Sequence, residues 1–297
     1  MIIIKLWGGL CNQMFQYAFG YALSRNFGDE LYFDDRYFYE QRRNVGKRKV
    51  VIDSYFSLSK FQIIERPHKF DLYENRYVNR IIRSIASGKQ IKCGKNYYFY
   101  KEPTRQYQES IPYIKENINY YDGYWLSSKY FVKYRNEIKE EFRLDERLRE
   151  EVNNHMIRAL EENSVALHIR RGDYLNKKNT PKGYNEQALA QYYQRAIRYI
   201  ISRVRNPIFY VFSDDIKWCE KNIETFGYDK KFVQNNKEKG DLLDLYCISS
   251  CRHGIMSPST FSWWGNWLRE DKSNSLVILP AGNYSNNKFA EKDWITM

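Results

Sequence analysis

Short apolar runs alternate with segments of helical hydrophobic spacing along the second half of the chain. Strands are predicted at 164–169, 208–212 and 276–279, and helices near 186–204, 215–226, 241–252 and 262–269. Such alternation is typical of a parallel sheet covered by helices. The pattern therefore predicts an α/β fold.

The first half of the chain begins in the same way and then becomes irregular. A strand at 2–6, a glycine turn and a helix over 14–23 come first, and 31–35 predicts a second strand. The pattern from there to about residue 100 is irregular. Further along, the sequence predicts a strand at 120–125, a helix over 129–143 and a charged helix over 145–163. We place the domain boundary inside that charged helix, between 155 and 156.

Composition and charge narrow the class of protein. The 297 residues are 43% hydrophobic and 28% charged, which fits a soluble globular protein of two domains of ordinary size or one large domain. The net charge of +12 favours anionic partners, namely nucleotide diphosphates, nucleic acid or an anionic membrane face. Five irregularly spaced cysteines argue against a disulfide framework and for a reducing compartment. No apolar run reaches the ~18 residues of a membrane span, so we expect a cytoplasmic protein.

The strand at 164–169 ends abruptly in charge, at Arg170, Arg171, Gly172 and Asp173. Two adjacent guanidiniums at the carboxyl end of a strand are costly to bury unless an anion meets them. In open α/β sheets, ligands bind beyond these strand ends. The motif therefore indicates a phosphate-bearing substrate. The alternative is a surface turn in which Asp173 pairs with Arg171.

A second candidate lies near the amino terminus. The strand at 2–6 is followed by Gly8, Gly9 and the start of a helix, an arrangement that can cradle an anion. The glycines of a dinucleotide fingerprint and the lysine of a Walker loop are absent.

Carboxylates in the second half allow two interpretations each. Asp214 and Asp215 follow a predicted strand and are suited to binding a divalent cation, but capping of the next helix by Ser213 or Asp214 is favoured. Asp241 and Asp244 open another helix, either as surface charges favoured by the helix dipole or with one carboxylate accepting from guanine.

Hydroxyls and sulfurs complete the candidates. Ser259, Thr260 and Ser262 lie at a loop-to-helix junction and are suited to phosphate, the alternative being ordinary capping by Ser259 or Thr260. Two cysteines and a histidine, at 247, 251 and 253, lack a complete tetrahedral ligand set and are interpreted as packing.

Together these motifs resemble the bacterial α-1,2-fucosyltransferases. The resemblance runs from about residue 2 to residue 294. It is carried in order by residues 8–18, 123–125, 168–174, 212–215, 244–251 and 259–265.

The resemblance implies an inverting transferase of the GT-B type, with two Rossmann-like domains whose parallel sheets face a cleft. Residues 1–155 would form the acceptor-side domain and 156–297 the GDP-fucose-binding domain. The enzyme would transfer L-fucose from GDP-fucose to the 2-hydroxyl of a galactose residue in an oligosaccharide, with no metal and no nucleic-acid partner. The expected setting is O-antigen or capsule biosynthesis, where the acceptor is in some cases lipid-linked.

The resemblance also implies roles for single residues. Arg170 would bind the β-phosphate and stabilise the leaving diphosphate, and Asn12 would lie near the fucose. These two are the expected catalytic residues. The substrate-binding set implied around them is Gly8, Gly9, Gln13, His168, Arg171, Asp173, Asp244, Ser259, Thr260 and Ser262, with His168 and Asp244 at the guanine. A metal-free transferase has to neutralise developing phosphate charge with such donors.

Two departures from the family pattern concern loops. Cys11 replaces a glycine, and Met256-Ser257-Pro258 replaces an Ala-Asn-Ser segment, so that position 258 cannot donate a backbone hydrogen bond. The general base stays open among Asp35, Asp122 and Asp173, as does a path with little base assistance.

Three further hypotheses remain. A metal-dependent nucleotide-sugar transferase would use Asp34 and Asp35, or Asp214 and Asp215. A non-enzymatic basic protein binding carbohydrate or nucleic acid would explain the charge and the aromatic residues but not the clustered strand-end motifs. Residues 77–85 read as a basic amphipathic helix, which either packs inward or attracts the protein to an anionic membrane.

Overall fold

The chain forms two compact units, Met1–Arg143 and Leu144–Met297. The structure is a computed structural model that describes residues 1–39, 48–64, 82, 84–161, 163–172, 185–234, 240–270, 274–281 and 290–297. The predicted boundary at 155/156 falls inside helix α6 (Glu146–Glu161), whereas the units divide before that helix begins. Helix α6 belongs to the second unit because it packs against α9 (Gly240–Ser250).

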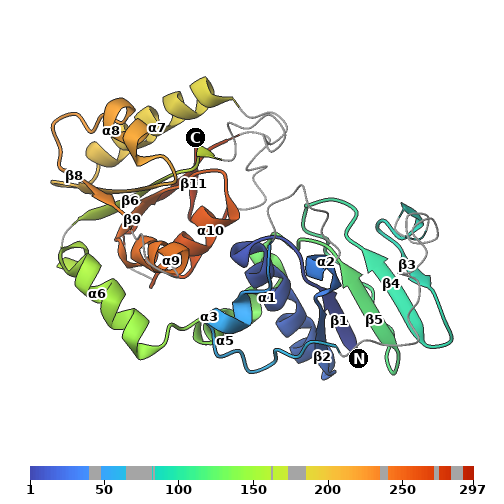
Figure 1. The fold of residues 1–297 in the computed structure, drawn as a ribbon. Helices are drawn as coiled ribbons and strands as arrows, with labels where there is room; N and C mark the ends of the chain where they lie inside the picture. The colour runs from blue at the N-terminus through green and yellow to red at the C-terminus, as the bar shows by residue number, and fades with distance from the viewer. Residues whose placement is uncertain are drawn as a thin grey trace. The chain divides into compact units, whose positions relative to one another are not determined.

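Unit 1 is built on a sheet in which the described strands follow the order β2-β1-β5-β4-β3. The strands are β1 (Ile2–Lys5), β2 (Leu31–Asp34), β3 (Gln90–Lys92), β4 (Tyr97–Lys101) and β5 (Ile118–Asp122). All pair in parallel except β3, which runs antiparallel to β4. Figure 1 shows this sheet with β3 at one edge and β2 at the other. The prediction of a strand at 120–125 was therefore shifted, and β3 and β4 were missed.

Helix α1 (Leu10–Phe27) covers one face of this sheet and is buried along most of its length. The approach is close because Gly20 has no side chain: a Cβ there would lie 2.8 Å from Ile4 Cγ1. Phe19 stacks on Trp125 with ring centroids 3.9 Å apart, which joins α1 to the segment after β5. On the other face Ile3 packs with Tyr97, Phe99 and Tyr120.

The remaining helices of unit 1 are short. They are α2 (Arg36–Tyr39), α3 (Ile52–Tyr55), the 3-10 helices η2 (Ser128–Tyr130) and η3 (Val132–Tyr134), and α5 (Arg135–Glu141). The predicted helix over 129–143 is thus divided into three pieces. Its apolar positions Phe131, Tyr134, Ile138 and Phe142 are nevertheless all buried.

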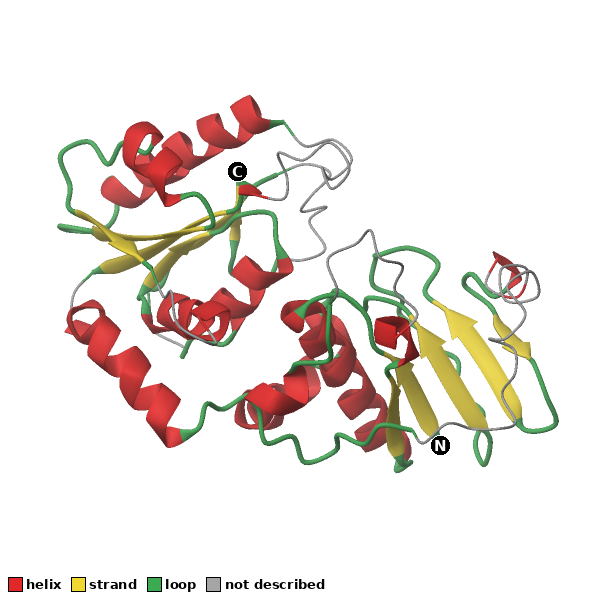
Figure 2. Ribbon diagram, viewed as in Figure 1, coloured by secondary structure: helices red, strands yellow, loops and turns green. Residues whose placement is uncertain are grey.

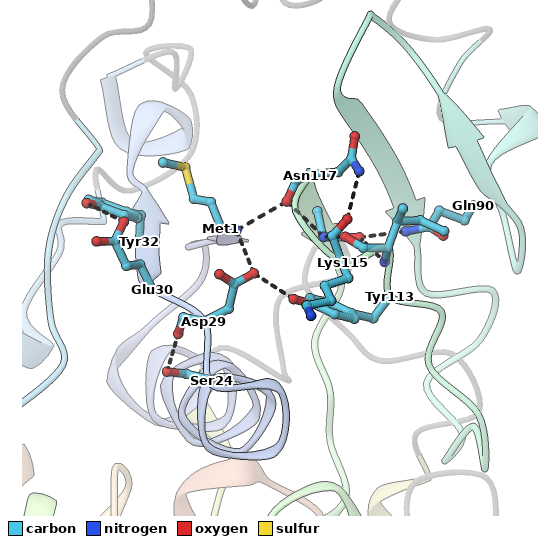
Figure 3. Close-up of polar contacts among 11 residues, drawn as sticks. Met1, Ser24, Asp29, Glu30, Tyr32, Gln90, Tyr113, Lys115 and Asn117 are labelled. Atoms are coloured by element: carbon cyan, nitrogen blue, oxygen red, sulfur yellow. Dashed lines mark hydrogen bonds and ion pairs between the residues drawn. The ribbon is translucent and has the colours of Figure 1, made fainter.

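A polar network fastens the amino-terminal edge of the unit 1 sheet (Figure 3). The Met1 amino group lies 2.6 Å from Asp29 Oδ2 and donates to the Asn117 carbonyl at 3.1 Å. Tyr113 donates to the same Asp29 oxygen at 2.8 Å, and Gln90 donates to Asn119 at 3.0 Å. These contacts tie the starts of β1 and β5 together, while the Gln90 side chain joins the antiparallel strand β3 to β5. Ligands of open α/β sheets bind at the opposite, carboxyl edge.

Unit 2 holds a fully parallel sheet in which the described strands follow the order β11-β10-β9-β6-β7-β8. The strands are β6 (Ser164–Ile169), β7 (Ile208–Ser213), β8 (Lys230–Val233), β9 (His253–Ile255), β10 (Val277–Leu279) and β11 (Ile295–Thr296). The helices are α6, α7 (Glu186–Ile201), α8 (Ile216–Asn222), α9 and α10 (Thr260–Trp267).

Helices cover both faces of this sheet (Figure 2), with α7 and α8 on one face and α9 and α10 on the other (Figure 1). Residues of α7 such as Leu189, Ala196 and Ile200 pack with Val165 and Leu167 of β6. The sequence prediction of a helix-covered parallel sheet is confirmed, including the exact bounds of β6. In the described ranges no helix is long and apolar enough to cross a membrane.

Candidate functional site

The predicted phosphate-binding segments of unit 2 meet at one edge of its sheet. Strands β9, β6 and β7 are neighbours and run parallel, so their carboxyl ends lie side by side. The segments that follow them carry the hydroxyl cluster 257–262, the pair Arg170 and Arg171, and the pair Asp214 and Asp215. Ligands of open α/β sheets bind at such an edge.

Arg170 lies at the surface of this edge and is oriented by Asp214. Its Nε is 3.1 Å from Asp214 Oδ2, and its side chain is 38% exposed. The other Asp214 oxygen accepts the Arg171 backbone N–H at 2.8 Å. Gly172 permits this approach, because a Cβ there would lie 2.9 Å from Asp214 Oδ2. The guanidinium of Arg170 is thereby held in place for an anionic ligand.

Arg171 has a different environment although it is the next residue. Its Nε lies 3.2 Å from Asp215 Oδ2, its Nη1 contacts Glu186 Oε1, and its guanidinium stacks on Trp218 at 4.1 Å from the ring centroid. Burial lowers the pKa of Arg171, but hydrogen bonds to Glu186 and Asp215 outweigh burial and raise it above the ordinary value. The expected substrate contact is therefore replaced by partners inside the protein. Asp173, which was expected to bind substrate or to pair with Arg171, lies outside the described residues.

Asp215 is the amino-terminal cap of α8, accepting the Trp218 N–H at 3.1 Å. The expectation that Ser213 or Asp214 is the cap was thus wrong by one or two residues. Ser213 instead accepts from the Asp215 N–H at 3.0 Å. Both carboxylates of the pair that a metal-dependent transferase would use are engaged with arginines. Across the described ranges, no three His, Cys, Asp or Glu side chains gather as metal ligands would.

His168 is buried at the end of β6 as a neutral imidazole. Burial lowers its pKa to about 3, and the nearby positive charge of Arg170 adds to the effect. Its ring lies 5.2 Å from that of Phe261, which follows β9. Its Nδ1 has no hydrogen-bond partner among the residues described. A buried polar atom without a partner is costly, so a ligand that supplies one would be favoured here.

The hydroxyl cluster has one member suited to direct ligand contact. Ser259 caps α10 by accepting from the Ser262 N–H at 3.1 Å, and the Ser262 hydroxyl accepts from the Ser257 N–H at 3.1 Å. Ser262 is fully buried, so its role is to shape the loop. Thr260 is half-buried, and its hydroxyl has no hydrogen bond within the described ranges. The capping alternative therefore holds for Ser259, while Thr260 is positioned for phosphate.

Asp244 is half-buried on α9, which packs against α10 beside the same edge. Cys247 of this helix and Cys251 just after it are buried thiols, and the Cys251 thiol donates to the Cys247 carbonyl. His253 accepts the Leu276 N–H at 3.0 Å through Nδ1. The interpretation of 247, 251 and 253 as packing fits these contacts.

In unit 1 the glycine turn after β1 has the conformation that its sequence requires. Gly8 has a φ of +84°, in the left-handed region, and a Cβ there would collide with Asn12 Nδ2. Gly9 is the cap position of α1, and no side chain caps that helix. The Asn12 side chain is half-buried and makes no hydrogen bond in the described ranges, which fits a ligand-contacting role.

Gln13 was expected to contact substrate, but the structure uses its amide internally. Its Nε2 donates to the Gly8 carbonyl at 3.2 Å and the Lys49 carbonyl at 2.9 Å, and its Oε1 accepts from Val51 and Ile52. Gln13 is fully buried. It therefore fastens the 49–52 segment to the glycine turn.

The carboxylates at the same edge differ in availability as general bases. Asp122 is buried 3.5 Å from the Lys5 ammonium. Asp34 receives Arg36 at 2.9 and 2.8 Å and the Tyr120 hydroxyl at 2.6 Å, so it is poorly suited to a metal. Asp35 is half-buried, which leaves it the more accessible of the two base candidates that the structure describes.

Sequence reasoning missed Glu102, a buried carboxyl directly after β4. One of its oxygens accepts the N–H groups of Tyr124 at 2.7 Å and Trp125 at 3.3 Å, while Oε1 is buried with no partner among the described residues. Burial raises its pKa to about 7 despite these hydrogen bonds. Trp125 has a φ of +57°, so Glu102 stabilises a turn that is strained for a non-glycine residue. Tyr124 stacks on Trp7 with centroids 3.9 Å apart.

These features define an α/β fold of two units, and comparison with known proteins supplies the family. The model of glycosyl transferase family 11 matches residues 1–297. The chain is 32% identical over 288 residues to an alpha-1,2-colitosyltransferase of Escherichia coli, covering 95% of this chain and 91% of the relative. It is 32% identical to the O-antigen biosynthesis glycosyltransferase WbnK of Escherichia coli, covering 98% of each. The chain therefore belongs to glycosyl transferase family 11.

More distant relatives agree on the class and the fold. Galactoside alpha-(1,2)-fucosyltransferase 2 of Bos taurus is 34% identical over 153 residues, or 49% of this chain and 44% of that protein. The crystal structure of fucosyltransferase NodZ from Bradyrhizobium has a TM-score of 0.56 at 12% identity, covering 90% of this chain and 92% of NodZ. An Arabidopsis thaliana FUT1 mutant in complex with GDP has a TM-score of 0.54 at 12% identity, covering 95% and 71%. The protein is a glycosyltransferase with a GT-B-like fold.

Proposed function

We propose that this protein transfers L-fucose from GDP-fucose to the 2-hydroxyl of a galactose residue in a glycan acceptor, with inversion and without a metal. The observation that carries the proposal is the edge of unit 2, where Asp214 orients the partly exposed guanidinium of Arg170 beside the neutral imidazole of His168. Family membership along the whole chain supports the reaction class. The names of the two Escherichia coli relatives support an O-antigen glycan as acceptor and colitose as the rival donor sugar.

The chemistry follows from charge. The acceptor oxygen attacks the anomeric carbon, the bond from that carbon to the diphosphate breaks, and the hydroxyl proton passes to a base or to solvent. Negative charge then grows on the β-phosphate. A preoriented guanidinium stabilises this charge more in the transition state than in the ground state. Arg170 supplies the guanidinium, and the Thr260 hydroxyl with the N–H groups opening α10 supplies further donors.

Nucleotide choice tests the site assignment. Because a ligand that binds only the folded state raises its melting temperature, GDP should stabilise the protein well beyond ADP or UDP at equal concentration. Asp244→Ala should erase this preference, because a guanine N–H group would lose its acceptor. Differential scanning fluorimetry measures both effects. Equal shifts for the three nucleotides would overturn the guanine assignment.

Product analysis tests the reaction itself. The protein is incubated with GDP-fucose or GDP-colitose and a panel of galactose-terminated oligosaccharides, and the linkage of each product is determined. The expected product carries an α-1,2-linked fucose, and activity should survive excess chelator. Preference for colitose would correct the donor sugar, and loss of activity with chelator would restore the metal-dependent hypothesis.

We further propose peripheral association with an anionic membrane face. Residues 1–143 contain 25 lysines and arginines against 16 aspartates and glutamates, whereas residues 144–297 contain 23 against 20. The excess positive charge therefore belongs to the unit expected to receive the acceptor. Most of the predicted amphipathic segment 77–85 lies outside the described residues, so the proposal rests on charge.

A further inference from the structure

Residues of α7 and α8 line a groove. The two helices lie on one face of the unit 2 sheet (Figure 1). Its volume is about 530 Å³, which is within the range of small-ligand sites. Arg170, His168 and Thr260 do not line the groove, so the groove is separate from the residues proposed to bind GDP-fucose.

The lining from α7 is a row of uncharged amides. Gln187, Gln191 and Gln194 are spaced by four and three residues, which places them on one face of the helix. None of the three side chains makes a hydrogen bond within the described ranges. The facing residue on α8, Asn222, donates its Nδ2 to the Trp218 carbonyl at 2.8 Å, which leaves its Oδ1 as a further acceptor.

The groove also contains a tryptophan whose orientation is fixed. Arg171 stacks on the Trp218 indole at 4.1 Å from the ring centroid, and Asp215 and Glu186 hold Arg171 in turn. Trp218 is half-buried and lines the groove, so part of the ring surface is available to a ligand. Its indole N–H has no hydrogen-bond partner in the part of the chain that is described.

We propose that this groove is a saccharide-binding subsite that holds sugar units of the glycan acceptor remote from the reacting galactose. Only the source of the saccharide rests on the proposed function. Sugars present C–H faces that pack on an indole and adjacent hydroxyls that pair with the donor and acceptor of one amide. Among the described residues that line the groove, Arg195 alone is charged, so the lining favours a largely neutral ligand.

The subsite can be tested by binding without relying on activity. The protein is labelled with ¹⁵N-tryptophan, and the Trp218 indole signal is assigned with Trp218→Phe. It is titrated with a hexasaccharide of three N-acetyllactosamine units and with lactose as the short probe. The hexasaccharide should shift the Trp218 signal. A triple variant should abolish the shift, namely Gln187→Ala with Gln191→Ala and Gln194→Ala. It should remain folded, because alanine has the highest helix propensity.

Kinetics provide the second readout. The triple variant should raise KM for the hexasaccharide by about tenfold, as for loss of roughly one to two hydrogen bonds, and leave KM for lactose and GDP-fucose unchanged. Gln62→Ala, an exposed glutamine of unit 1, is the matched control and should change neither. An unshifted Trp218 signal, or equal effects on both probes, would overturn the subsite. Binding without transfer would instead contradict the proposed function and leave the subsite supported.

Discussion

Two adjacent arginines show how much a residue's role depends on contacts outside its own strand. Arg170 is half-buried with its Nε 3.1 Å from Asp214, whereas Arg171 is buried between Asp215, Glu186 and the Trp218 ring. Arg170→Lys keeps the charge but loses the fork of donors, so we expect turnover to fall on the order of a hundredfold with stability unchanged. Arg171→Lys should instead lower the free energy of unfolding by roughly 1–3 kcal/mol. Steady-state kinetics and urea unfolding separate the two, and similar profiles for both variants would contradict the assignment.

Glu102 gives a prediction for the dependence of stability on pH. Its carboxyl has a pKa of about 7 when folded against 4.5 for the ordinary group, because burial disfavours the charge. Between these values the unfolded chain has released its proton while the folded protein keeps it, so the stability contribution of Glu102 falls as pH rises from about 4.5 to about 7. Glu102→Gln should remove this fall, so that at pH 8 its free energy of unfolding exceeds that of the wild type by up to about 3 kcal/mol. Urea unfolding at several pH values measures the difference, and parallel curves would exclude Glu102 as the cause.

At the scale of elements, Gln13 and Gln16 of α1 hold the loops at the carboxyl edge of unit 1. Gln16 accepts the Trp7 N–H at 3.1 Å and donates to the carbonyls of Trp7 and Gly123 at 3.3 and 3.4 Å. Gln16→Leu keeps the volume but leaves the part-buried Trp7 N–H and the carbonyls of Trp7 and Gly123 without this partner, so we expect a loss of roughly 1–3 kcal/mol in unfolding free energy. The exposed residue Gln106 provides the control, since Gln106→Leu should stay within about 0.5 kcal/mol. Equal effects would show that Gln16 does not fasten the loops.

The strand that the sequence predicted best is long enough for a hydrophobic run and is buried throughout. β6 is buried at every position and was predicted at its observed bounds, whereas β9 has three residues, too short for a hydrophobic run. Gly254 in β9 reads as a turn residue, yet it is there because a Cβ would collide with Asn266 Oδ1. The helix over 129–143 was predicted from apolar spacing, which reports burial and not the hydrogen-bond type that distinguishes 3-10 from α turns. Glu102 was missed because β4, with four aromatic residues in a row, shows no alternation.

The site was predictable where a motif follows a strand and unpredictable where the partner comes from elsewhere. Arg170, His168 and Thr260 lie near a strand end or helix start that the sequence indicated. The separation of Arg171 from Arg170 depends on Glu186 and Trp218, which belong to two other helices. Gln13 was assigned to substrate because it lies in a motif, but its partners at 49–52 lie inside the segment whose sequence pattern is irregular. Tertiary contacts of this kind leave no local signal.

At the scale of the whole molecule, charge is divided unevenly between the two units. In unit 2, Arg170 and Arg171 pair with Asp214, Asp215 and Glu186. The lysines and arginines of this unit nearly balance its acidic residues. Most of the net charge of +12 therefore lies in residues 1–143, where the nucleotide edge does not account for it. Binding of unit 1 to an anionic surface would account for this excess charge, because positive charges that repel one another on a free surface are stabilised by an opposite charge nearby.

This surface can be identified by sedimentation with vesicles. The protein should pellet with vesicles containing anionic lipid at low salt and be released as salt screens the contact over a Debye length of roughly 10 Å at 0.1 M. Arg80→Gln with Arg83→Gln, in the predicted amphipathic segment, should weaken vesicle binding about thirtyfold, at ~1 kcal/mol for each of the two charges near the surface. Arg203→Gln with Arg205→Gln removes the same charge from unit 2 and should have little effect. Equal pelleting with neutral and anionic vesicles would contradict the membrane proposal, and equal loss in both variants would make the attraction a property of net charge alone.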